Sequence, residues 1–118
     1  MEYAVLLYAD ETKWEELDAE SRSKVYADHT EFMRLLEERG HKMTGGAELR
    51  ATSTARTARG SADSVAVTDG PFAETAEQLG GFYLIETDDV DDLVQLVGII
   101  SDGDPIEIRP CVPSAEQE

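Results

Sequence analysis

The segments Tyr3–Ala9 (YAVLLYA) and Phe82–Glu86 (FYLIE) decide the fold that this sequence predicts. Each is a short run of large aliphatic and aromatic residues, which is typical of a β-strand. Successive side chains of a strand point to opposite faces of its sheet, and both runs are apolar on both faces. Each face of the central sheet therefore needs an apolar cover.

Two substantial helices are expected to cover one of these faces. The first spans about Ala19 to Arg39, with Asp18 as its N-cap and Gly40 as its stop. The second spans Asp88–Ile100 and begins with an acidic turn, which suits the positive end of a helix dipole. Neither helix accounts for the other face of the sheet.

The segments between and after these helices predict further strands and turns. The stretch from His41 to Arg59 is rich in β-type patterns, a turn follows, and a short strand pairs back. We further expect one helical turn before the second two-faced strand and a strand close to the end of the sequence. The segments are Met43–Gly46 and Thr52–Arg59 as strands, Gly60–Asp63 as the turn, Ser64–Thr68 as the returning strand, Ala73–Leu79 as the helical turn and Ile106–Arg109 as the last strand.

The order of these elements predicts an α+β fold, a ferredoxin-like unit with an antiparallel sheet. The simplest cover for the second sheet face is the same face of a second copy, which would make a homodimer with a dimeric α+β barrel. The alternative is a monomer whose long middle segment folds over the sheet. The 118 residues predict one domain at 1–112 and a short C-terminal tail at 113–118.

Composition excludes several classes of protein. The sequence has 26 acidic and 10 basic residues, a net charge of -16, which disfavours binding to nucleic acid or to an anionic membrane. No apolar run is long enough to span a membrane, and the N-terminal residues lack the pattern of a signal peptide, so we expect a cytoplasmic protein. The single cysteine, Cys111, rules out an internal disulfide and a multi-thiolate zinc site.

One motif makes the sequence resemble a known family. Asp69–Phe72 (DGPF), the following Ala73–Thr75 and then Gly80–Tyr83 (GGFY) are similar to the YCII-related family, in particular to the branch named for its DGPF motif. The resemblance extends from about Glu2 to Pro110 and implies a dimeric α+β barrel. It also implies a histidine and an aspartate suspected of acid–base work, with a few relatives acting on small ring compounds. One departure is Ala76, where the family usually carries a lysine.

His29 and Asp69 are the candidate catalytic residues. His29 follows Val25 by four residues and precedes Phe32 by three, so it lies on the helix face that packs on the sheet. It is either a core histidine bonded to a backbone carbonyl or a general acid/base, since imidazole titrates near ~6.5. Asp69 either fixes the Gly-Pro turn with its carboxylate or orients the histidine in a cleft.

Four further residues are candidate ligand-binding residues. Tyr8 either lines a cleft or packs on the sheet, and Phe72 directly follows the turn. Glu74 is either a carboxylate of a first helical turn or a second acid in the cleft. Arg109 either pairs with a glutamate such as Glu107 of a neighbour or binds a carboxylate ligand. His41, just after the helix stop, is expected to be exposed and without function.

We predict no metal and no cofactor. The run Asp88–Asp92 lacks calcium-loop spacing and serves better as the charged first turn of a helix. Two functions of different class remain open. One is a cofactor-free acid–base enzyme acting on a small, cyclic or aromatic metabolite through His29 and Asp69. The other is a non-catalytic small-molecule-binding or regulatory module that uses the same cleft.

Overall fold

The computed structural model describes residues 1–117, and its centre is a four-stranded antiparallel sheet. The strand order is β2-β5-β1-β6, so β1 and β5 are the two central strands. The strands are β1 (Glu2–Ala9), β2 (Lys42–Glu48), β5 (Gln78–Glu86) and β6 (Ile106–Pro110). The α+β prediction is confirmed, and the arrangement is consistent with a ferredoxin-like unit.

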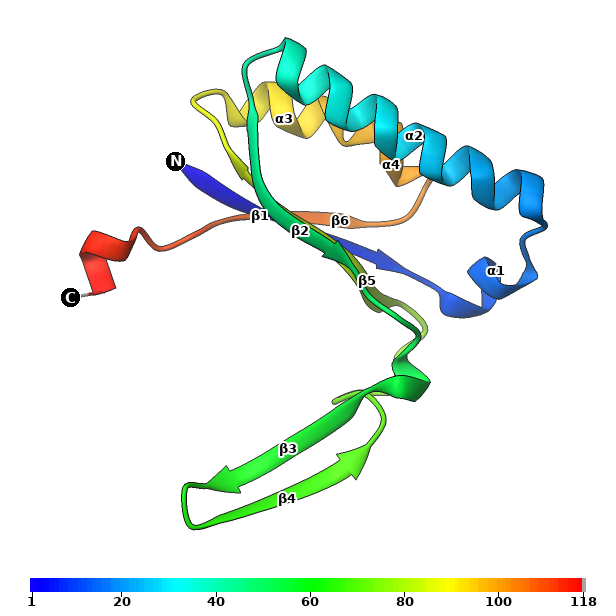
Figure 1. Cartoon of the computed structure of the whole chain (residues 1–118), viewed down its shortest axis with the longest axis vertical. Coiled ribbons are helices and arrows are strands. Elements are labelled where there is room, and N and C mark those ends of the chain that lie inside the picture. Colours follow the sequence, from blue (N-terminus) through cyan, green and yellow to red (C-terminus); the bar gives the residue numbers. More distant parts are fainter. Residues whose placement is uncertain (118) are drawn as a thin grey trace.

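Helices cover one face of this sheet (Figure 1). They are α2 (Ala19–Glu38), α3 (Val90–Leu96) and α4 (Gly98–Ser101), while the short helix α1 (Glu11–Glu16) follows the end of β1. The Asp18 carboxylate accepts a hydrogen bond from the Ser21 amide and caps α2, as predicted. The chain leaves α2 through Gly40, whose φ of +83° lies in the region that favours glycine.

The core lies between the helices and one set of strand side chains. Val5 and Ile85 of the central strands, Phe32 of α2 and Leu93 of α3 are each 0% exposed. Side chains of the opposite parity point away from the helices, and we call the surface that they form the outer face. On the central strands Leu6 lies opposite Phe82 and Ala4 opposite Leu84, so the middle of the outer face is apolar.

A second sheet of two strands stands apart from the first. It consists of β3 (Arg56–Ser61) and β4 (Ser64–Asp69), which pair only with each other. Figure 1 shows this hairpin extending away from the sheet and helices, below the short helix η1 (Thr52–Thr54). The predicted turn at Gly60–Asp63 and the returning strand Ser64–Thr68 are confirmed.

The chain is flat and open for its length. Its principal extents are 48 × 47 × 17 Å and its radius of gyration is 16.5 Å, whereas a compact domain of this length has about 13.5 Å. Its accessible surface is 8415 Å², against about 6,300 Å² for a compact monomer of this mass.

Four details differ from the sequence prediction. The strand expected over Thr52–Arg59 begins only at Arg56, because Thr52–Thr54 forms the short helix η1. Ala73–Glu77 forms bends instead of a helical turn, and β5 begins at Gln78. The helix predicted over Asp88–Ile100 is divided into α3 and α4 at Val97. His41 is 5% exposed instead of solvated, because Thr87 and Asp92 bind its two ring nitrogens.

The predicted tail contains one further short element, η2 (Ser114–Gln117). Among the helices of residues 1–117, none combines the length and apolar character needed to cross a bilayer.

Candidate functional site

His29 lies between α2 and the sheet, half-buried beside Tyr83 of β5. Its Nδ1 atom is 2.7 Å from the Tyr83 hydroxyl oxygen. The two rings are 5.9 Å apart between centroids, and Phe32 packs on Tyr83 at 5.5 Å. The partner of His29 is therefore a side-chain hydroxyl on the central sheet, and not the backbone carbonyl of a core histidine.

Burial sets the charge of both members of this pair. It lowers the pKa of His29 below its ordinary 6.5, and the charges of Asp28 and Glu48 oppose that shift. Burial also raises the pKa of Tyr83, with Glu48 acting in the same direction. At neutral pH His29 is thus a neutral imidazole next to a protonated phenol.

The second ring nitrogen of His29 is open. Within residues 1–117, Nε2 of His29 makes no hydrogen bond, and no fully buried polar side-chain atom lacks a partner. Nε2 must therefore retain contact with solvent. A neutral imidazole held at one nitrogen and open at the other is able to exchange a proton with a bound molecule.

Aromatic and acidic side chains flank the His29–Tyr83 pair. The Tyr26 hydroxyl donates a hydrogen bond to Oε1 of Glu48 at 2.9 Å, which raises the pKa of Tyr26. Trp14 meets Tyr26 edge to face at 5.7 Å, and Arg22 lies over the Trp14 ring. We call His29, Tyr83, Tyr26 and Glu48 the His29 cluster. It is contributed by α2, β2 and β5.

Asp69 lies in the two-stranded sheet, apart from the four-stranded sheet that holds Tyr83. It is the last residue of β4, opposite Arg56 in the ladder, and its carboxylate makes no hydrogen bond or ion pair within residues 1–117. The turn after it is fixed by the backbone, because the Gly70 amide donates to the Ala55 carbonyl at 2.7 Å. Figure 1 shows β4 well separated from α2, so one chain does not bring Asp69 to His29.

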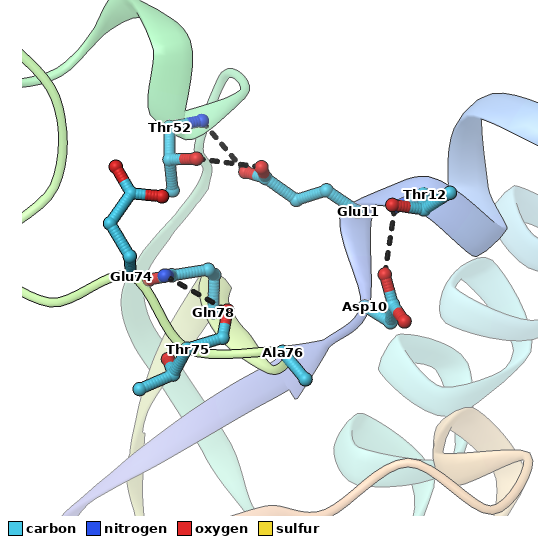
Figure 2. A pocket seen from close by; sticks show the side chains of 8 residues that line it. All are labelled: Asp10, Glu11, Thr12, Thr52, Glu74, Thr75, Ala76 and Gln78. Carbon is cyan, nitrogen blue, oxygen red and sulfur yellow. Dashed lines mark hydrogen bonds between the residues drawn. The ribbon is translucent and has the colours of Figure 1, made fainter.

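Phe72 and Glu74, from the same motif, also lie away from His29. Phe72 is 77% exposed, with the Arg59 guanidinium 5.1 Å from its ring. Glu74 lines a polar cavity of about 240 Å³ together with Asp10 and Glu11. Figure 2 shows this cavity at the root of the hairpin.

Glu11 connects α1 to the short helix η1 on one side of this cavity. Its carboxylate accepts hydrogen bonds from the amide and the hydroxyl of Thr52, both at 2.7 Å. Ala76, at the position where the family that the sequence resembles usually carries a lysine, is also in the lining. The wall therefore offers carboxylates and hydroxyls, and no cation. This arrangement suits a ligand that donates hydrogen bonds.

Tyr8 and Arg109 meet on the outer face of the sheet. The Tyr8 hydroxyl donates to Oε1 of Glu107 at 3.5 Å, and Arg109 donates to Oε2 of the same carboxylate at 2.6 Å. Arg109 thus pairs within its own chain. The predicted ligand-binding residues fall into two groups, one on the outer face and one at the hairpin root.

Sequence reasoning missed Tyr83, the residue that holds His29. Its signal was its parity: Tyr83 shares a strand face with Ile85, which is buried under the helices. A phenol on that face needs a hydrogen-bond partner, and His29 is the polar residue on the facing side of α2.

As for metal, no three His, Cys, Asp or Glu side chains in the part of the chain that the structure describes are grouped to bind an ion.

Comparison with known proteins identifies the family of this chain. The sequence profile of the YCII-related domain matches residues 1–105. An uncharacterized protein of Rhizobium meliloti (strain 1021) is 40% identical over 114 residues, which covers 93% of this chain and 91% of the relative. With nearly the whole strand and helix framework included in the match, the chain belongs to the YCII-related family.

Proposed function

We propose that this YCII-related protein is a homodimeric acid–base enzyme that acts without a cofactor on a small ring metabolite, with His29 as its proton carrier. One observation carries the proposal: Nδ1 of His29 is held by Tyr83 at 2.7 Å while Nε2 stays open. A proton carrier needs such a nitrogen, which a bound molecule can reach.

The proposed chemistry is the transfer of one proton through Nε2. In the tautomer that donates from Nδ1 to the Tyr83 oxygen, Nε2 carries a lone pair and accepts a proton from the substrate. The imidazolium that forms is stabilised by the negative charges of Asp28 and Glu48, the same charges that oppose the lowering of the His29 pKa. The proton then returns to another atom of the substrate, so His29 ends the cycle neutral.

The homodimer is proposed through the outer face. The middle of this face carries Leu6, Phe82 and Leu84, which no helix of the chain covers. The chain also exposes about 2,000 Å² more surface than a compact monomer of its mass. That excess is comparable to what one subunit contributes to a large, stable interface.

We assign Asp69 to the site of the partner subunit, because its own chain keeps it away from His29. Asp69 is the first residue of the DGPF motif, and this motif supports membership of the DGPF branch. In that branch an aspartate is suspected of acting beside the histidine in proton transfer, which supports the same role for Asp69. Phe72 and Glu74 then remain predicted ligand contacts near the hairpin root, while Tyr8 and Arg109 remain predicted contacts on the outer face.

Exchange of carbon-bound hydrogen tests the enzyme directly. The protein is incubated in D₂O with cyclopentanone or γ-butyrolactone, and deuterium uptake next to the carbonyl is followed by proton NMR. We expect the wild type to exceed the buffer rate, and His29→Gln to lose about 100-fold or more of the excess. Thr30→Ala, one residue further along α2 and exposed, is the matched control and keeps the full rate.

Subunit mixing tests the assignment of Asp69. His29→Gln and Asp69→Asn are each expected to be inactive as homodimers. Exchanged heterodimers would combine one intact His29 with one intact Asp69 across the dimer, and recover activity. Failure to recover activity would exclude a site shared between subunits.

The second candidate function is a non-catalytic binding module. It is favoured by the cavity at Glu74, whose lining does not include His29. For this function, compounds that raise the melting temperature would act equally on wild type and on His29→Gln, and Glu74→Gln would remove their effect. An acid–base enzyme predicts the opposite dependence on His29.

A further inference from the structure

The β3–β4 hairpin has no cover within its own chain. Every residue of β4 is exposed, and only Thr57 of β3 is partly buried. A hairpin of two strands is marginally stable in water unless it packs on something else. Figure 1 shows it extending beyond the body of sheet and helices. Phe72, which contacts Arg59 of the hairpin, is itself 77% exposed.

One face of the hairpin is apolar except for Arg56 and Asp69, which lie opposite each other at its root. Val65 and Val67 are 59% and 57% exposed, and they lie opposite Gly60 and Ala58 in the ladder. The other face carries mostly polar residues: Thr57, Arg59, Ser61, Ser64 and Thr68, together with Ala66. We call the first of these the valine face. Such an alternation is typical of a sheet with one buried and one solvated side.

The root of the hairpin is rigid. Glu11 of α1 binds the amide and hydroxyl of Thr52, and the Leu49 amide donates to the Gly80 carbonyl at 2.9 Å. The Gly70 amide closes the root from the other strand through the Ala55 carbonyl at 2.7 Å. These hydrogen bonds attach the root of the hairpin to α1 and to β5.

The charge of this segment differs from the rest of the chain. Residues 49–62 include three arginines and no carboxylate, in a protein with a net charge of -16. Arg50, Arg56 and Arg59 form no ion pair within residues 1–117. Asp63 in the turn and Asp69 on β4 balance Arg56 and Arg59, so the hairpin itself is neutral. A surface that complements this segment is apolar opposite the two valines and carries carboxylates that can pair with Arg50, Arg56 and Arg59.

We infer that the hairpin is an arm that lays its valine face on a second copy of this chain. A second copy supplies the acidic surface, and two bodies of -16 approach each other most easily where one presents a neutral, arginine-bearing segment. The excess exposed surface of the chain includes this arm. The inference rests on the proposed homodimer and extends it beyond the outer face.

Two matched variants test the arm. Val65→Asp with Val67→Asp places two charges on the valine face, and Ala66→Asp with Thr68→Asp places the same two charges on the opposite face. By sedimentation equilibrium the first pair is expected to raise the dimer Kd by about tenfold or more, and the second pair by less than about threefold. Hydrogen exchange of amides 56–69 is expected to slow when wild-type concentration is raised above the Kd.

The outcomes separate the arm from the dimer. A dimer that tolerates both variants equally, with hairpin amides unprotected at every concentration, overturns the arm and leaves an outer-face dimer in place. A wild type that stays monomeric at high micromolar concentration overturns the arm and the proposed homodimer together. Because the hairpin does not pack on the core, circular dichroism of the variants at low concentration should match the wild type, and a loss of helix signal would count against a free-standing arm.

Discussion

Nε2 of His41 donates a hydrogen bond to Oδ2 of Asp92 at 2.7 Å, joining the start of β2 to α3. Nδ1 of the same ring lies 2.6 Å from the Thr87 hydroxyl, which in turn accepts from the Asp89 amide. The order of groups is that of a hydroxyl–imidazole–carboxylate triad. His41 and Thr87 are each 5% exposed, so the network connects β2, β5 and α3 and offers no route to a substrate.

Removing this imidazole should destabilise the fold. His41→Ala leaves the Thr87 and Asp92 side chains without their partner, and we expect a loss of about 1–3 kcal/mol in the free energy of unfolding. Arg39→Ala is the control, because Arg39 also binds Asp92 but from an exposed position, where a loss below about 1 kcal/mol is expected. Urea unfolding measures both, and equal losses would show that the buried pair is no stronger than the exposed one.

His29 should titrate below the ordinary histidine range. Since burial lowers its pKa from 6.5, the ring C–H resonance followed by NMR should shift at a midpoint below that value. The unfolded chain then binds more protons than the native one between the two pKa values. Stability contributed by His29 is complete above pH 6.5 and is lost as pH falls through the native pKa. His29→Gln should flatten this part of the stability profile, and a midpoint above 6.5 would contradict the role of burial.

A charge on the outer face should break the dimer. Leu6→Asp puts a carboxylate between Phe82 and Glu107, its neighbours across the sheet. We expect a 13.0 kDa species in sedimentation at micromolar concentration, where the wild type sediments at twice that mass. Val94→Asp, on the exposed surface of α3, controls for the added charge and should remain dimeric. A wild type of 13.0 kDa would refute the interface.

Added salt should stabilise the protein. With a net charge of -16 the native state repels itself, and raising ionic strength from 0.01 to 0.1 M shortens the Debye length from about 30 to about 10 Å. Each kcal/mol of repulsion removed should raise the melting temperature by about 4 °C or more. A flat melting temperature over this range would mean that local ion pairs, such as Arg34 with Glu31 and Glu38, already compensate the charge.

The framework of the fold was predictable because it depends on local patterns. Asp18, Gly40 and the apolar spacing of α2 are consecutive signals, and the two-faced strands identify the central strands of the sheet. The helical turn expected at Ala73–Leu79 was wrong, because β5 extends back to Gln78 and pairs there with Ala9. That pairing joins residues far apart in sequence, and no local pattern specifies it.

The candidate site was less predictable for the same reason. His29 was correctly placed on the sheet-facing side of its helix, but its partner Tyr83 is 54 residues away. His41 was predicted to be exposed, because nothing near it in sequence shows that Asp92 and Thr87 enclose it. A local pattern shows which face a side chain occupies, whereas its hydrogen-bond partner depends on the register between distant strands.

The central position of β1 also has a consequence for the order of folding. β1 is synthesised before both of its neighbours, β5 and β6, whose residues follow it by about 70 to 110 positions. Contacts of such high sequence separation carry a large loop-closure entropy and slow folding. On the ribosome the apolar strand Tyr3–Ala9 must therefore wait, unpaired, until nearly all of the domain has emerged. During that interval it is an exposed apolar segment of the kind that chaperones protect.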